Sequence, residues 1–255
     1  MRGLVAVILG LMALDANASD IWGSWYGTNQ GQAQGTVVFS FFPNGEYFLN
    51  DHGNPALDPN GHPGIERGTY SWNEATGAFS ATTLVNGDGE WGLSDGAPSQ
   101  ISIAGNTLTV PGPDGVVLHR LTNPSSALVG GWYLRDGPAL GVLDFLPDGT
   151  YLLGATNPNF FEYGTYLWNS ATGAFEPHVL ETTNVSDGFG GATNYSIVVD
   201  GDHIVISSSV DVTTFNAVAP LAVPEPETYA LMLAGIGLLG AAGRRKRAAR
   251  TKTVT

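Results

Sequence analysis

The sequence contains no cysteine, and residues 19–222, called the body below, contain no lysine. Without cysteine, the chain forms neither disulfides nor thiol-based catalytic or metal sites, so its hydrophobic core must hold it together. The body has three arginines against 20 acidic residues, a formal charge of −17. An acidic surface repels phosphate-rich partners, which excludes nucleic-acid binding.

The body also lacks any amphipathic helical pattern, although at about 200 residues with many aromatics it is long enough for a core. It consists instead of short alternating apolar segments separated by turn residues. Residues 37–42 and 46–50, for example, flank Pro43-Asn44-Gly45. Asn-Gly supplies the positive φ that tight hairpins need, so these segments predict antiparallel strands.

The body contains the same unit twice. "GTYSWNEATGAF" from Gly68 and "GTYLWNSATGAF" from Gly164 agree at ten of twelve positions, 96 residues apart. The first copy carries an extra loop, "DHGNPALDPNGHPG". Each copy is about 100 residues long, a domain-sized repeat with about eight strands. We predict an all-β fold of two duplicated antiparallel meanders, each a small barrel or sandwich; the alternative is one merged barrel or a shared sheet.

The two ends differ in character from the body. Arg2, an apolar run over residues 4–14, and the small residues Ala16 and Ala18 predict a signal peptide that signal peptidase removes after Ala18. The predicted parts are therefore the signal peptide (1–18), the first β repeat (19–123), the second β repeat (124–222) and a C-terminal tail (223–255).

The tail contains one apolar segment. Residues Thr228 to Gly243 carry no charge, but a spanning helix needs about 20 such residues, so this one is short. A basic cluster follows, which we expect to stay on the cytoplasmic side and leave the body outside the inner membrane. Its residues are Arg244, Arg245, Lys246 and Arg247.

Before this segment stand Val223, Pro224, Glu225 and Pro226. The order of this motif, the apolar helix and the arginine cluster resembles the PEP-CTERM sorting signal of Gram-negative bacteria, over residues 223 to about 250. The resemblance implies cleavage near the motif by an exosortase, a transient stay of the precursor in the inner membrane with its body in the periplasm, and then release or transfer to the cell surface. It also implies an association with exopolysaccharide and biofilm.

A second resemblance lies at the start of each repeat. Gly23-Ser24-Trp25 and Gly130-Gly131-Trp132 resemble the Gly-x-Trp of lipocalin-like barrels. This would imply a carrier of a small apolar ligand, which needs a hollow barrel. The units are short and rich in large aromatics, so we expect filled interiors.

No catalytic residue and no cofactor is predicted. "GLSDG" from Gly92 lacks the strand and helix of a nucleophile elbow. Asp51, Asp58 and His62 in the extra loop are candidate metal ligands, although a solvated loop suits them better. Tyr70, Trp72, Tyr166 and Trp168 recur in both copies and are expected in the core rather than on a sugar-stacking platform. The aromatics outside the shared pattern are the candidate ligand contacts: Trp91, Phe160, Phe161 and Phe189.

These observations favour a non-enzymatic exported protein of the cell surface or matrix, with a structural or binding role linked to exopolysaccharide. One alternative is the lipocalin-like carrier. Another is a polysaccharide hydrolase, which would need two carboxylates about 5–10 Å apart facing one cleft.

Overall fold

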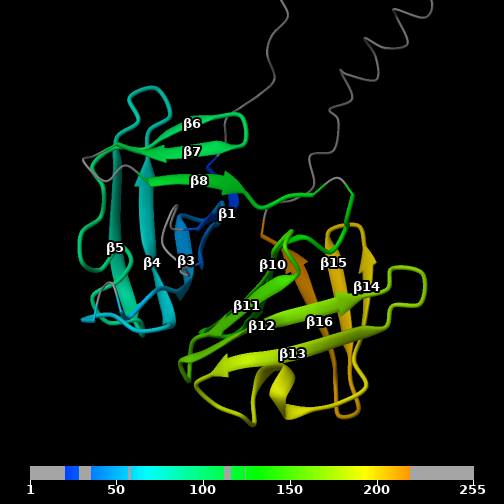
Figure 1. Cartoon of the computed structure of the whole chain (residues 1–255). Helices are drawn as coiled ribbons and strands as arrows, with labels where there is room; N and C mark the ends of the chain where they lie inside the picture. Colours follow the sequence, from blue (N-terminus) through cyan, green and yellow to red (C-terminus); the bar gives the residue numbers. More distant parts are fainter. Residues whose placement is uncertain (1–20, 29–35, 57–58, 112–115, 124, 219–255) are drawn as a thin grey trace, which may run out of the picture. The chain divides into compact units, whose positions relative to one another are not determined.

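The protein is described by a computed structural model over residues 21–28, 36–56, 59–111, 116–123 and 125–218. These residues form two eight-stranded antiparallel sheets, which confirms the predicted all-β fold of two duplicated units (Figure 1). The first sheet contains β1 (Gly23–Thr28), β2 (Thr36–Phe41), β3 (Glu46–His52), β4 (Gly64–Trp72), β5 (Phe79–Asn86), β6 (Ser102–Ala104), β7 (Thr107–Val110) and β8 (Val116–Arg120). The second contains β9 (Gly130–Asp136), β10 (Ala139–Phe145), β11 (Thr150–Ala155), β12 (Phe160–Trp168), β13 (Phe175–Thr182), the 3-10 helix η1 (Gly188–Gly191), β14 (Ser196–Asp200), β15 (His203–Ser207) and β16 (Val212–Ala217).

The two sheets have the same strand order. The first runs β5-β4-β3-β2-β1-β8-β7-β6 and the second β13-β12-β11-β10-β9-β16-β15-β14. Among the described residues, one isolated bridge links the outermost strands of each sheet, Ala78 with Gln100 in the first repeat and Ala174 with Ser196 in the second. Each sheet is therefore a curled half-barrel, and the alternative of one merged barrel or shared sheet is wrong.

The turn chemistry explains the matching hairpins. Gly45 between β2 and β3 has φ +81°, and Gly149 between β10 and β11 has φ +85°. This left-handed region favours glycine because a side chain would clash there. The Asn-Gly and Asp-Gly turns of the two copies thus fix the same strand register.

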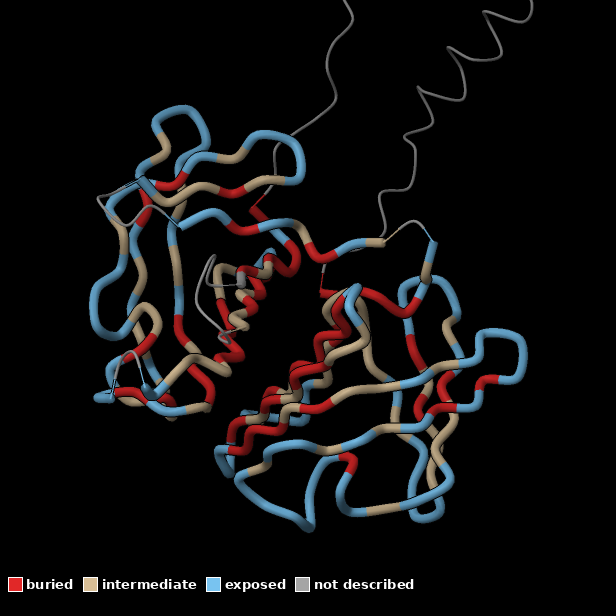
Figure 2. Tube along the Cα trace, in the orientation of Figure 1, coloured by how far each residue is buried: buried red, intermediate tan, exposed pale blue. Residues whose placement is uncertain are grey.

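Each sheet curls around its own aromatic core. Trp25 and Trp132 are buried on the first strand of each repeat, and their indole N–H groups donate to the carbonyls of Ile21 (2.7 Å) and Leu128 (2.9 Å). Figure 2 shows buried residues within both sheets and exposed residues along their loops. The recurring Tyr70, Trp72, Tyr166 and Trp168 pack against these cores, as expected from their recurrence in both copies.

A third buried cluster contains residues of both repeats and joins them. It covers the second face of β3 and β11, which are buried on both faces. Asn50 of β3 donates from Nδ2 to Oδ2 of Asp144 of β10 at 2.8 Å. A Cβ at Gly154 would collide with Asn50, so the fit is close. The cluster consists of Val38, Phe42, Phe48, Ile65, Leu121, Val129, Leu140, Val142, Leu146, Leu152, Phe161 and Val218.

This junction brings equivalent positions of the two copies face to face. The hairpins align at an offset of 104 residues, so Asn50 corresponds to Gly154 and Ser40 to Asp144. Asn50 meets Gly154, and Ser40 lies beside Asp144. Burial raises the pKa of Asp144 to about 7, against the opposing effect of Asn50 and the serine hydroxyls.

The ends of the chain are outside this description. In the part that the structure describes, no helix has the length and apolar character needed to cross a membrane. The predicted signal peptide with Ala16 and Ala18, the motif Val223 to Pro226, and the segment from Thr228 to Arg247 all lie outside the described residues.

Candidate functional site

The curled second sheet encloses a cavity of about 540 Å³ that is open at one side. The expectation of a filled interior is therefore wrong for this repeat. The cavity lies inside one repeat, and its lining comes from β9 to β12, the segment around η1, β15 and β16. The lining includes Leu134, Gly141, Leu143, Leu153, Ala155, Phe160, Phe189, Tyr195, Ile206 and Phe215.

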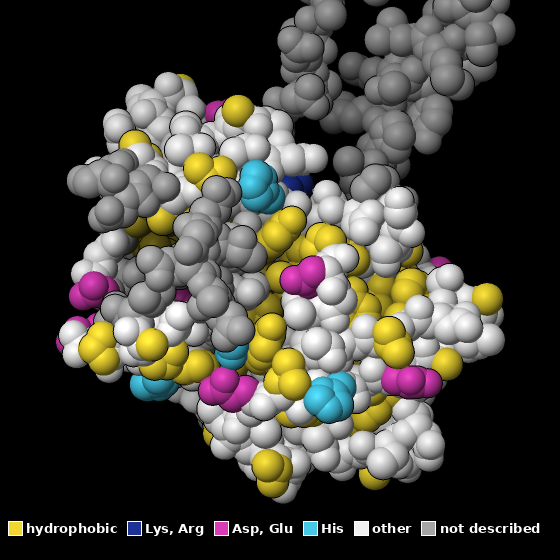
Figure 3. All heavy atoms as spheres, viewed as in Figure 1, with side chains coloured by type: hydrophobic (Ala, Val, Ile, Leu, Met, Phe, Trp, Pro, Cys, Tyr) yellow, Lys and Arg dark blue, Asp and Glu magenta, His cyan; other side chains and the backbone are white. Residues whose placement is uncertain are grey.

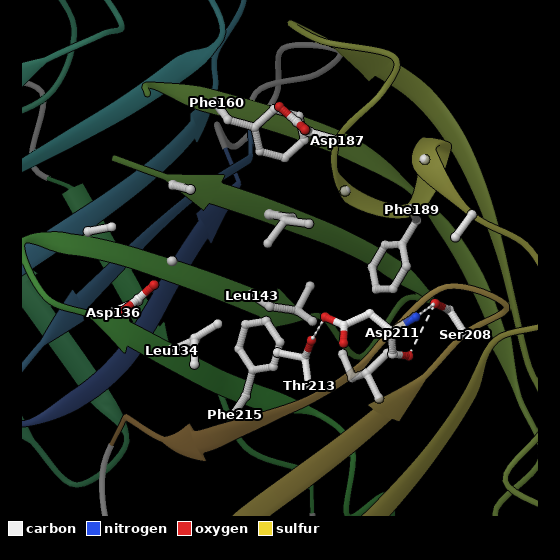
Figure 4. A pocket seen from close by; sticks show the side chains of 18 of the residues that line it. Leu134, Asp136, Leu143, Phe160, Asp187, Phe189, Ser208, Asp211, Thr213 and Phe215 are labelled. Carbon is white, nitrogen blue, oxygen red and sulfur yellow. Dashed lines mark hydrogen bonds between the residues drawn. The ribbon is translucent and has the colours of Figure 1, made fainter. Parts of the chain in front are cut away.

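Strand alternation gives the cavity its apolar floor. Leu143, Phe189 and Ile206 are buried there, and Phe215 of β16 is half-buried. Figure 4 shows Leu143, Phe160, Phe189 and Phe215 around the same space. Successive strand residues point to opposite faces, so Phe160 lines the cavity while its neighbour Phe161 packs in the junction between repeats.

The helix η1 carries Phe189 into this space, and a buried carboxyl group holds the helix. Glu162 of β12 accepts from the backbone N–H of Phe189 (3.0 Å) and of Gly190 (3.4 Å), and from the hydroxyl of Tyr151 (2.8 Å). Burial raises the pKa of Glu162, against these three donors. A Cβ at Gly188 would lie 2.6 Å from a Glu162 oxygen, so the segment needs glycine there.

The first repeat contains the same arrangement. Glu66 accepts from the hydroxyl of Tyr47 and from the backbone N–H of Ser94 (2.9 Å). Both glutamates follow an apolar residue and stand two residues before the shared "GTY". Sequence reasoning missed this Tyr–Glu pair, although its recurrence 96 residues apart for the glutamate and 104 for the tyrosine was a readable signal.

The corresponding end of the first repeat is closed by Trp91. This side chain is only 7% exposed and packs on Gly53 and Gly61, where any Cβ would run into the indole. At the offset of 96 residues, Trp91 corresponds to Asp187, which lines the cavity of the second repeat. An aromatic plug is thus present in the first repeat at the position where the second repeat has an exposed carboxylate.

Buried acids lie beside this plug. Asp88 is fully buried, and neither of its carboxyl oxygens has a hydrogen-bond partner. Burial, with Glu66 and Asp51 nearby, raises the pKa of Asp88 to about 8. Burial likewise raises the pKa of Asp51 to about 7. Both groups are therefore substantially protonated at neutral pH.

Two of the three candidate metal ligands lie within the described residues. Asp51 is buried in β3, His62 is exposed with Nδ1 3.2 Å from the carbonyl oxygen of Pro63, and Asp58 lies outside the described residues. Within the described ranges, no group of three or more His, Asp or Glu side chains is placed to hold a metal ion. Ser94 of "GLSDG" donates its hydroxyl to the carbonyl of Trp91 (3.0 Å) and belongs to the loop held by Glu66.

The four candidate ligand aromatics separate into three places. Phe160 and Phe189 line the cavity, Trp91 fills the first repeat, and Phe161 lies in the junction. All four are buried, which does not suit flat stacking against a polysaccharide on the surface. The arrangement around the cavity can enclose a small apolar molecule.

Comparison with known proteins identified the tail alone. Residues 222–247 match the family model of the PEP-CTERM protein-sorting motif. The comparisons with curated proteins and with solved structures gave no match. The resemblance of the body to lipocalin-like barrels thus stays a prediction.

Proposed function

Because the chain carries a PEP-CTERM sorting signal, which implies export and exosortase processing of a membrane-anchored precursor, we propose that its body is a non-enzymatic binding protein for a small apolar molecule. The observation that carries this proposal is the cavity of about 540 Å³ in the second repeat. Small-molecule sites are typically concave, mostly apolar and about 300–1,000 Å³ in volume.

The chemistry of the lining supports binding rather than catalysis. The floor is formed by leucine, isoleucine and phenylalanine side chains, and the acidic side chains of the described lining, Asp136, Asp187 and Asp211, are exposed rather than held against that floor. An apolar floor also offers few partners for sugar hydroxyl groups, so we favour binding over polysaccharide hydrolysis. The protein would meet its ligand at the cell surface or in an exopolysaccharide matrix, where the sorting signal would deliver it.

A neutral fluorescent probe tests this proposal. We expect the protein, purified from a bacterium that exports it, to bind about one N-phenyl-1-naphthylamine per chain with increased fluorescence. Gly141→Leu should weaken binding at least about ten-fold, or about 1.4 kcal/mol. A Cβ at Gly141 meets no atom closer than 3.7 Å, so the added side chain can enter the cavity without distorting the strand.

Gly96→Leu is the matched control, because a Cβ there meets no atom within 4 Å. This variant should bind the probe like the unaltered protein. Absence of probe binding, or equal binding by the Gly141→Leu and Gly96→Leu variants, would contradict the proposal.

A further inference from the structure

Three carboxylates from separate segments surround the mouth of the cavity. Asp136 ends β9, Asp187 precedes η1, and Asp211 precedes β16. All three are exposed at the rim and lie on different sides of the cavity in Figure 4. Asp187 accepts from Nδ2 of Asn184 (2.7 Å) and Asp211 from the hydroxyl of Thr213 (3.1 Å), which orients both groups.

Among the described residues, Arg135 precedes Asp136, and Arg67 donates from Nη1 to the carbonyl of Pro138 (2.8 Å), but both arginines already pair with Glu46. The described lining contains no lysine, arginine or histidine. Arg135 is the only lysine or arginine in residues 125–218, and its guanidinium lies 2.5 Å from Oε2 of Glu46 in the first repeat. Figure 3 shows acidic side chains spread over the face in view and very little lysine or arginine.

Below the rim, the walls of the cavity are suited to an alkyl chain and to the methylene groups next to a cationic head group. Phe160, Phe189, Phe215 and Tyr195 line the cavity. Aromatic faces attract organic cations as well as apolar groups. A concave site with low-dielectric walls also focuses the field of its rim charges.

We infer, on the basis of the proposed function, that the ligand is a single-chain cationic amphiphile. Its alkyl chain occupies the space between Leu143, Phe189 and Ile206. Its amine or quaternary ammonium group lies at the rim between Asp136, Asp187 and Asp211. A fatty acid of the same length would place its carboxylate among three others and binds more weakly.

The expected discrimination follows from the exposure of the rim. An ion pair at an exposed site contributes about a 1.4- to 5-fold gain in affinity, and salt screens it. Three such carboxylates around one mouth predict a preference of about ten-fold or more for a cation over an anion. The preference should shrink as the salt concentration rises.

The experiment compares three probes with the same ten-carbon chain: decyltrimethylammonium, 1-decanol and decanoate. Each displaces N-phenyl-1-naphthylamine from the exported protein at low and high salt. We expect the ammonium to bind most tightly and decanoate most weakly. The triple variant Asp136→Asn, Asp187→Asn, Asp211→Asn should lose this order while keeping its affinity for the neutral probe.

A variant with the same change in net charge is the control: Asp95→Asn, Glu176→Gln, Asp200→Asn, all at exposed positions outside the lining. It should retain the order. If the three probes bind equally, or decanoate binds best, the ligand class is wrong while the proposed function stands. If the control loses the order as fully as the rim variant, the rim carboxylates are not responsible. If no probe binds, the proposed function itself fails.

Discussion

The two repeats share a scaffold and differ at one end of the sheet. In the first, Trp91 is buried against Gly53 and Gly61; in the second, Asp187 occupies the corresponding place and lines the cavity. The features that shape the fold recur, including the tryptophan on the first strand and the buried Tyr–Glu pair. The difference teaches that two copies of one fold can share a scaffold while a single loop position holds a buried aromatic in one copy and lines a ligand-sized cavity in the other.

The largest effect is expected from removing the Trp91 plug, which tests the difference between the two repeats directly. Trp91→Ala should destabilise the protein by about 3–5 kcal/mol, the usual range for deleting a buried tryptophan. It should also open a cavity beside Gly53 and Gly61 and raise probe binding from one to two molecules per chain. Chemical denaturation and a fluorescence titration measure the two effects.

Trp22→Ala is the control, since that indole is 39% exposed and lies outside the plugged end. It should change stability far less and leave the number of probe sites at one. A Trp91→Ala protein that still binds a single probe would show that Trp91 is not what closes the first repeat.

The second prediction concerns the buried pair that both repeats share. Glu162→Ala leaves the Tyr151 hydroxyl and the N–H groups of Phe189 and Gly190 without their acceptor. Stability should fall by about 2–4 kcal/mol, because unsatisfied buried donors are costly. Probe affinity should fall too, since Phe189 loses its anchor.

Glu66→Ala should destabilise to a similar extent but leave probe affinity unchanged, because it acts in the filled repeat. Comparing the Glu162→Ala and Glu66→Ala variants therefore separates the effect on stability from the effect on probe binding. Equal loss of probe affinity in both variants would argue against an independent role for each repeat.

The third prediction concerns the junction. Gly154→Ala places a Cβ against Asn50 and 2.5 Å from Cγ2 of Ile65. Overpacking of this kind costs about 1–3 kcal/mol. Gly96→Ala, in open space, should not destabilise the protein, and denaturation midpoints compare the two variants. Equal midpoints would mean that the junction is less tightly packed than described.

The smallest effect, taken per pH unit, is a pH dependence centred on the first repeat. The raised pKa values of Asp88 and Asp51 mean that these groups hold protons in the folded state that the unfolded chain has already released. Their contribution to stability is therefore complete below about pH 4 and is lost as the pH rises to about 8. Asp88→Asn should flatten this decline by at most about 1.4 kcal/mol per pH unit.

Asp95→Asn, at an exposed position, is the matched control and should leave the slope unchanged. Unfolding free energies measured from pH 4 to pH 9 give the comparison. A slope that Asp88→Asn does not alter would assign the decline to Asp51, Asp144 or Glu162.

Much of this fold could be predicted from the sequence, because strand alternation and turn residues act locally. The duplication gave the number of units, and the Asn-Gly and Asp-Gly turns gave their hairpins. The junction was not predicted, because a strand buried on both faces is normally marked by a continuous apolar run, and β3 carries the polar Asn50 and Asp51 at two of its buried positions. Its partner surface comes from residues about 90 positions away, such as Asp144.

The cavity was harder to predict than the fold. Whether an interior is filled depends on where a loop residue lies, and Trp91 and Asp187 both stand in turn-rich stretches. Phe160 and Phe189 were singled out as ligand contacts and do line the cavity, whereas Trp91 and Phe161 pack elsewhere. The carboxylates of the rim carry no local pattern, since Asp136, Asp187 and Asp211 converge only through the curl of the sheet.

The junction also determines which repeat surfaces fit against each other. Ser24 stands against Gly131, Ser40 against Asp144 and Asn50 against Gly154, so each position meets its own counterpart, and the two members differ every time. Two second repeats would bring two aspartates together and leave voids opposite each glycine, while two first repeats would press asparagine on asparagine. The two surfaces of the junction are therefore complementary to each other, and neither is complementary to a copy of itself.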